Sequence, residues 1–207
     1  MLCSSKPTED RIKEAAKEVF MEKGFDGTTT RDIAKVAGIN SALMNYYFRS
    51  KEKLFHSIFT DMCGLFFEGM IQMFNSNIPL REKIEALIDH EYTMMRENPR
   101  ISIFIMNELH RNPERLSQLI GPTKRIIEDS FQKQIDEAVA AGTIRNVNAQ
   151  HVFMMIIANI QFPFISKPVL QLTWNMNEET FALFCDQHIK LIKESICSYL
   201  FEFQPAC

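Results

Sequence analysis

The sequence predicts an all-α protein in which an N-terminal three-helix head with a helix-turn-helix is joined to a larger helical body. Three observations favour this fold class. Apolar residues recur at the three- and four-residue spacing of a helix face, and no segment shows strand-like alternation. Glycine is scarce, at 7 of 207 residues, whereas Phe (17) and Met (12) are abundant, which favours long elements with few tight turns. Prolines divide much of the remaining chain into segments of helical length.

The first helix is expected to begin after Pro7-Thr8 and to end at Gly24. Its apolar positions follow the i, i+3, i+4, i+7, i+8 spacing of one helix face; they are Ile12, Ala15, Ala16, Val19 and Phe20. Glu9 and Asp10 fall in its first turn, where the helix dipole favours negative charge. The segment therefore reads as an amphipathic helix with one buried face.

Two short helices are expected next. Thr29 and Asp32 have the spacing of a capping box and would start a helix that ends at Gly38. Asn40 can cap a further helix that runs to about Phe48. Two helices joined by so short a turn containing glycine predict a helix-turn-helix.

The body is expected to consist of longer helices. One begins near Lys51 and continues to the Asn75-Ser76-Asn77 break, so that the head and the body share it. Further helices are expected near residues 80–97, 100–110, 114–119, 123–141, 148–165 and 178–201. The predicted domains are a head at 1–52 and a body at 53–207.

The charge of the chain differs between its two parts. The formal net charge is -3 with a sequence pI near 6.0, a bulk value that argues against a polyanionic partner. Residues 1–56, however, hold 10 Lys plus Arg and 8 Asp plus Glu, whereas residues 57–207 hold 13 and 18. The acidity therefore belongs to the body, and the head is slightly basic.

The sequence contains neither a targeting segment nor a signature of disulfides or metal. No basic-then-apolar signal opens the chain, and no run approaches the roughly 20 apolar residues that span a bilayer, so a cytoplasmic protein is expected. The five cysteines show no C-x-x-C spacing, which predicts reduced thiols and no zinc site. An isolated thiol could serve as an oxidation sensor, but a buried inert cysteine is the more common case.

The segment from Thr28 to Leu54 carries two motifs. Thr28-Thr29-Thr30-Arg31-Asp32-Ile33-Ala34 precedes the turn, and Tyr46-Tyr47-Phe48-Arg49-Ser50-Lys51-Glu52-Lys53-Leu54 follows it. This region resembles the head of TetR-family transcriptional regulators, whose pattern has Thr-Thr-x-Arg-Asp-Ile-Ala and Tyr-x-Phe-x-Ser-Lys-Glu-x-Leu at this spacing. The resemblance extends over roughly residues 8–56 and implies a DNA-binding head.

The expected recognition helix has suitable side chains for the major groove. Small and polar residues lie near its N-terminus, whereas Met44 and Phe48 are spaced to anchor it to the head. The resemblance implies backbone contacts from Thr29, Thr30, Tyr47 and Lys51, and base contacts from Arg31, Ser41, Ala42, Leu43 and Tyr46. Many family members carry Tyr at the position of Asn45, and here the amide could instead pair with an adenine edge.

The body is expected to bind a small molecule and a second copy of the chain. Its abundant Met and Phe are typical of adaptable packing around a ligand, although at helical spacing they more often form a core. The candidate ligand residues are Phe66, Met70, Met95, Phe104, Asn107, His110, Phe131, Met155 and Asn159. The resemblance implies a dimeric four-helix bundle, with candidate interface residues Phe181, Phe184, His188, Leu191 and Ile192.

These observations predict a homodimeric repressor that a small apolar or amphiphilic ligand releases from a palindromic DNA operator. No cofactor, metal site or catalytic residue is expected, because G-x-S-x-G, H-E-x-x-H, Walker and G-x-G-x-x-G motifs are absent from the sequence. Two alternatives remain open at this point: an all-helical interaction module without DNA binding, and a helical enzyme without recognisable motifs.

Overall fold

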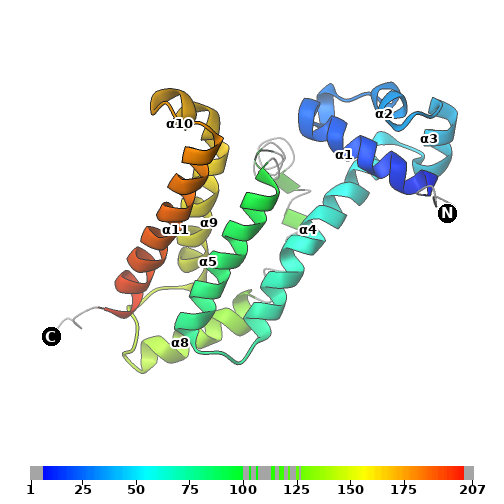
Figure 1. Cartoon of the computed structure of the whole chain (residues 1–207). Coiled ribbons are helices and arrows are strands. Elements are labelled where there is room, and N and C mark those ends of the chain that lie inside the picture. The colour runs from blue at the N-terminus through cyan, green and yellow to red at the C-terminus, as the bar shows by residue number, and fades with distance from the viewer. Residues whose placement is uncertain are drawn as a thin grey trace, which may run out of the picture. The chain divides into compact units, whose positions relative to one another are not determined.

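The computed structural model describes residues 7–99 and 127–202, together with the single positions 103, 106, 113, 114, 117, 118, 121 and 125. This described part is helical and has no β-strand, which confirms the predicted all-α class (Figure 1). The chain divides into two compact units, Met1–Leu65 and Phe66–Cys207. The division falls inside helix α4 (Lys51–Asn75), later than the boundary proposed from sequence at its start.

The head contains α1 (Thr8–Gly27), α2 (Thr30–Ala37), α3 (Ser41–Phe48) and the first part of α4. All five apolar residues expected on one face of the first helix are buried. They share the head core with Ile33, Ala34, Ala37, Met44, Phe48, Leu54, Phe55, Ile58 and Phe59. At Gly24 the backbone of α1 leaves the helical region, with φ 70° and ψ 174°, before a further turn reaches Gly27. The interruption therefore occurs at the glycine where the sequence predicted the helix end.

The ends of α2 and α3 have the predicted caps. The Thr29 hydroxyl accepts a hydrogen bond from the Asp32 N–H at 3.2 Å, and the Asp32 carboxylate accepts one from the Thr29 N–H at 2.9 Å. Gly38 ends α2 in the left-handed conformation, with φ 64° and ψ 38°. The Asn40 side chain then accepts from the Leu43 N–H at 2.8 Å and starts α3. The helix-turn-helix is thus specified by local interactions that its own sequence encodes.

The described helices of the body are α5 (Leu80–Glu97), a π-helical turn η1 (Ile127–Phe131), α8 (Gln132–Ala140), α9 (Ala149–Ile165), α10 (Lys167–Thr173) and α11 (Glu178–Phe201). Helices α5, α9 and α11 pack against one another, as Figure 1 shows. The helix expected at 123–141 is present from 127 as η1 followed by α8, and α10 was not predicted. The helices expected near 100–110 and 114–119 lie almost wholly outside the described residues.

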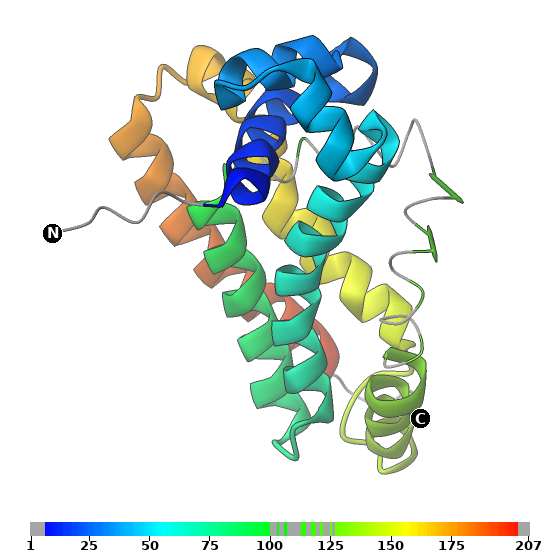
Figure 2. The ribbon, with the colours of Figure 1, turned by 90° about the vertical axis from the view of Figure 1, so that its right-hand side faces the viewer.

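One end of the body is held by a buried lysine. The Lys83 ammonium donates hydrogen bonds to the carbonyl oxygens of Phe74 and Ser76, both at 2.8 Å, where α4 ends. The Ser130 hydroxyl donates to the same Phe74 carbonyl at 2.7 Å, and the rings of Phe74 and Phe131 lie 5.0 Å apart. These contacts place η1 near the end of α4. Figures 1 and 2 show α8 at the same end of the body as the turn between α4 and α5.

Helix α9 is strongly apolar and contains Pro163 near its C-terminus. Within the described residues, no single helix meets the length and hydropathy needed to cross a membrane. Helices α9 and α10 reach that threshold only when taken together, and the pair is bent by 61° between them.

Candidate nucleic-acid interface

The recognition helix α3 has two clearly different sides. Met44 is fully buried and Phe48 nearly so, and both anchor the helix in the head core. The opposite side carries the exposed residues Ala42, Asn45 and Tyr46, of which Tyr46 is 78% exposed. Tyr47 is also exposed, and Ser41 and Leu43 are half-buried. A helix anchored in this way presents one continuous side to a DNA groove.

The two tyrosines of α3 support each other. Their ring centroids lie 5.4 Å apart at an interplanar angle of 87°, an edge-to-face arrangement that aromatic pairs favour. Neither ring is part of the core, since Tyr46 and Tyr47 are both exposed. Exposed phenols at the end of a recognition helix are suitable donors to phosphate oxygens.

The N-terminus of α2 combines a cap with candidate phosphate contacts. The Thr29 hydroxyl donates to the Asp32 carboxylate at 2.6 Å, and the Lys23 ammonium lies 3.0 Å from the same carboxylate. These hydrogen bonds hold the pKa of Asp32 far below its usual range, so this carboxylate stays ionised. Thr30 is half-buried and Arg31 is exposed, so both side chains remain candidate contacts at this helix N-terminus.

Lys51 has a structural role that could not be predicted from its sequence context. Its ammonium donates to the carbonyl oxygens of Phe25 and Thr28, at 2.9 and 3.0 Å, and lies 4.2 Å from the centre of the Phe25 ring. These contacts join the start of α4 to the segment before α2. An ammonium has three N–H donors, so one remains for a phosphate.

Arg49 is a candidate DNA contact that sequence reasoning missed. It follows α3 directly, is exposed, and has a positive φ of 60°. Its backbone N–H donates to the Asn45 carbonyl at 2.9 Å, which closes the last turn of α3. The available signal was a basic residue at a variable position of the Tyr-x-Phe-x-Ser-Lys-Glu motif.

The structure separates the candidate ligand residues of the body into three groups. Met70, Met95 and Phe131 are buried in its core. Met155 instead lines an open surface groove, and the exposed Asn159 donates from its side-chain amide to the Met155 carbonyl at 2.6 Å. The remaining candidates, Phe104, Asn107, His110 and the side chain of Phe66, lie outside the described residues.

The candidate interface residues on α11 also have different surroundings. Phe181 and Ile192 are buried within their own chain, where the Phe181 ring lies 6.1 Å from that of Phe164. Phe184 and His188 are half-buried and stack on each other, with ring centroids 5.6 Å apart. Leu191 is 59% exposed. Other large apolar side chains are exposed on these helices, namely Met154 and Phe162 on α9 and Leu183 and Tyr199 on α11.

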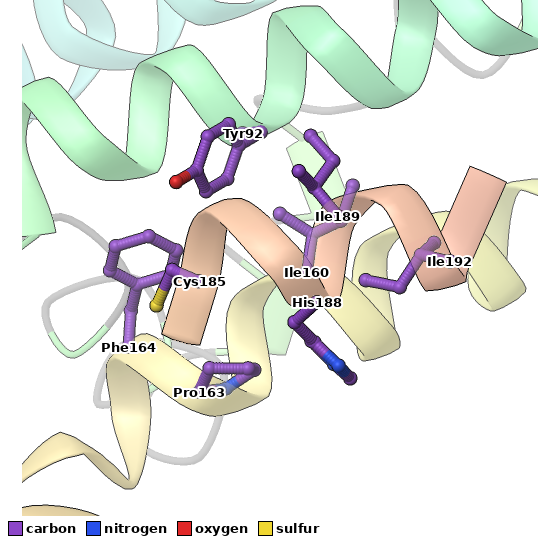
Figure 3. A pocket seen from close by; sticks show the side chains of 8 residues that line it. All are labelled: Tyr92, Ile160, Pro163, Phe164, Cys185, His188, Ile189 and Ile192. Carbon is purple, nitrogen blue, oxygen red and sulfur yellow. The ribbon is translucent and has the colours of Figure 1, made fainter. Parts of the chain in front are cut away.

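The region between α5, α9 and α11 is closely packed. Figure 3 shows eight side chains from these helices around a cavity of about 10 Å³, which is room for one water molecule. Its lining includes Cys185, and burial, together with the nearby Asp186 carboxylate, raises the pKa of this thiol to about 11. Burial likewise raises the pKa of Cys197, so neither described thiol has the thiolate character of a redox sensor.

The head and body together define a helix-turn-helix DNA-binding protein with a helical regulatory domain. Residues 12–58 match the family model described as bacterial regulatory proteins, tetR family. The Bacillus subtilis fatty acid metabolism regulator protein is 24% identical over 86% of this chain and 89% of its own length. The Escherichia coli regulator RutR is 28% identical over 72% of this chain and 70% of its own. These matches support a TetR-family transcriptional regulator.

Solved structures show the same fold along nearly the whole chain. A TetR-family regulator from Marinobacter aquaeolei superposes with a TM-score of 0.69 and 18% identity, covering 94% of this chain and 95% of its own. The Bacillus subtilis regulator FadR in complex with stearoyl-CoA has a TM-score of 0.62 and 21% identity, covering 88% and 96%. The fold thus agrees with the family match and the curated relatives, which support a DNA-binding transcriptional regulator, and the two alternatives considered from sequence are not favoured.

Proposed function

We propose that this protein is a homodimeric repressor that binds a palindromic operator and leaves it when a small apolar or amphiphilic effector enters the body. The observation that carries the DNA-binding role is the two-sided α3 helix, whose exposed residues face away from the buried Met44 and Phe48. The cytoplasm, where the operator is located, is the compartment that this function requires.

In this proposal, the exposed side of α3 reads base edges while its surroundings hold the DNA backbone. Asn45 pairs with an adenine edge, and Arg31, Ser41, Ala42, Leu43 and Tyr46 complete the base contacts. Thr29, Thr30, Tyr47 and Lys51 contact phosphates, and the exposed Arg49 joins them. Because the head is only slightly basic, affinity must come from placed contacts and from two heads acting together.

The surface of α9 and α11 supports the dimer. Met154, Ala158 and Phe162 follow one another at four-residue spacing on α9, and Leu183 and Leu191 are eight residues apart on the neighbouring α11. All five are exposed in the single chain. An apolar surface of this kind marks an interface, and a second copy of the same chain would cover it with twofold symmetry.

Helix α4 supports the proposed control by an effector. It belongs to both compact units, so a change at its body end is transmitted to the head through continuous helix. An effector that prefers one arrangement of the body would shift the population of DNA-binding heads by its difference in affinity between the two states.

The DNA-binding role is tested by fluorescence anisotropy with the duplex upstream of the gene. The wild-type protein is expected to bind with an affinity that falls steeply as salt rises. Asn45→Ala is expected to weaken specific binding by about tenfold or more, because one good base contact contributes about 1–3 kcal/mol. The matched control is Asn77→Ala, which removes an exposed asparagine between α4 and α5. Equal affinity of both variants, or binding that ignores salt, would contradict the proposal.

A further inference from the structure

Glu91 is a buried carboxyl group in the body with one oxygen unpaired. It lies on α5 with 1% of its surface exposed, on the same helix face as the fully buried Ile88 and Met95. Its Oε1 accepts a hydrogen bond from Nε2 of Gln161 on α9 at 2.7 Å. Its Oε2 is buried and has no hydrogen-bond partner among the described residues. Buried polar atoms rarely lack a hydrogen bond, so the unpaired Oε2 indicates a position where a further hydrogen-bond donor could bind.

The contrast with the other buried polar side chains sharpens this point. In the described part of the chain these are Thr28 and Lys83. The Thr28 hydroxyl donates to the Gly24 carbonyl at 2.6 Å, and the Lys83 ammonium donates to two carbonyls. Both groups are therefore satisfied by the fold itself. Glu91 differs from both, because its Oε2 is a buried polar atom that has no hydrogen-bond partner within the residues that the structure describes.

The electrostatic state of Glu91 agrees with its geometry. Burial raises the pKa of this carboxyl to about 7, against a smaller lowering by the Gln161 amide. Near neutral pH the protonated and ionised forms of Glu91 are therefore close in free energy, and a bound partner can favour one of them. An ionised carboxylate can only accept hydrogen bonds, and a nearby cation would stabilise it strongly in an apolar interior.

We propose that Glu91 and Gln161 form the polar end of the effector site, and that the effector is an amphiphile whose head group donates hydrogen bonds, most strongly as an ammonium. This inference rests on the proposed control by an effector. In the ionised form Oε2 accepts a hydrogen bond from a donor head, whereas a carboxylate head would be repelled. Ile88 and Met95 are fully buried on the same helix face, so the surroundings of Glu91 on α5 are apolar, as the tail of such a molecule requires.

The test uses three probes with the same ten-carbon tail, decylammonium, 1-decanol and decanoate, below their micelle concentrations. Binding to the full-length protein is measured by isothermal titration calorimetry at pH 7.5. Decylammonium is expected to bind most tightly and decanoate least. Glu91→Gln is expected to weaken decylammonium by about tenfold or more and to leave 1-decanol nearly unchanged. The matched control Glu82→Gln, an exposed glutamate on the same helix, should alter none of the three affinities.

Several results would overturn the inference. These are decanoate binding as tightly as decylammonium, equal weakening of all three probes by Glu91→Gln, or no binding by any probe. Release of the labelled upstream duplex is measured in parallel and separates the two proposals. If decylammonium binds through Glu91 without releasing DNA, the head-group assignment stands and the control by an effector fails. If decanoate binds best and releases DNA, control by an effector stands and the assignment fails.

Discussion

Single residues in this regulator often serve the fold and the interface together. Thr29 uses its hydroxyl to cap α2, and Lys51 uses two donors on backbone carbonyls, yet both lie at the surface proposed to contact DNA. Substituting either residue would therefore change the stability of the head together with its affinity. Asn45 and Tyr46, which are exposed on α3, separate the two effects more cleanly.

Glu91 leads to a prediction about how the stability of the protein depends on pH. Its pKa is raised from 4.5 to about 7 in the folded chain, so the folded state binds the proton more tightly than the unfolded state. The free energy of unfolding should therefore decrease as the pH rises from about 4.5 to about 7. Glu91→Gln removes this penalty, which is at most about 3 kcal/mol. We expect the variant without ligand to have a clearly higher Tm than wild type at pH 8.

The comparison at acid pH tests the cause of that stabilisation. At pH 5 the advantage of Glu91→Gln should shrink to a small fraction of its value at pH 8, because folded wild type is then mostly protonated. Thermal unfolding followed by circular dichroism at both pH values measures the difference. An equal gain at pH 5 and pH 8 would show that packing, and not the buried charge, explains the effect.

At the scale of elements, α4 and α5 approach each other closely at a glycine. A Cβ atom placed on Gly69 would clash with the ring atoms Cε1 and Nε2 of His90. Gly69→Ala is therefore expected to displace the His90 ring or separate the two helices, at a cost of about 1–3 kcal/mol. The measurement is the urea midpoint of the full-length protein.

Gly64 on the same helix is the matched control. A Cβ atom there meets nothing within 4 Å, so Gly64→Ala should stabilise α4 by up to about 1 kcal/mol through the entropy of the unfolded chain. The identical change at two positions of one helix should thus have opposite signs. If both variants stabilise the protein, the close contact between Gly69 and His90 has no energetic importance.

The elements that sequence could predict are those whose signals are local. Thr29 with Asp32, Gly38 and Asn40 lie within a few residues of the ends they define, and the structure has each cap where it was expected. The roles of Lys51 and Glu91 could not be predicted, because their partners lie 23 to 70 residues away in the chain. The burial of Phe181 and Ile192 inside one protomer could not be predicted. The spacing of apolar residues along a helix shows that one face is covered, but not which element covers it.

At the scale of the whole molecule, the exposed apolar surface of α9 and α11 predicts a dimer. Phe162 and Leu191 are 64% and 59% exposed in the single chain, and two charges there should disrupt a twofold interface. We expect wild type to sediment as a dimer at micromolar concentration and Phe162→Glu/Leu191→Glu to sediment as a monomer with weaker operator binding. Val36→Glu, at an exposed apolar residue of the head, should remain dimeric. A monomeric wild type would contradict this prediction.

The continuity of α4 across both compact units also restricts where residues can be inserted into this chain. An α-helix advances about 100° per residue, so a single inserted residue in the middle of α4 would rotate everything beyond it by about 100° about the helix axis. An insertion of seven residues, close to two full turns, would nearly restore the angle. Natural variation in α4 should therefore be confined to substitutions, while insertions accumulate in the turns that connect the helices.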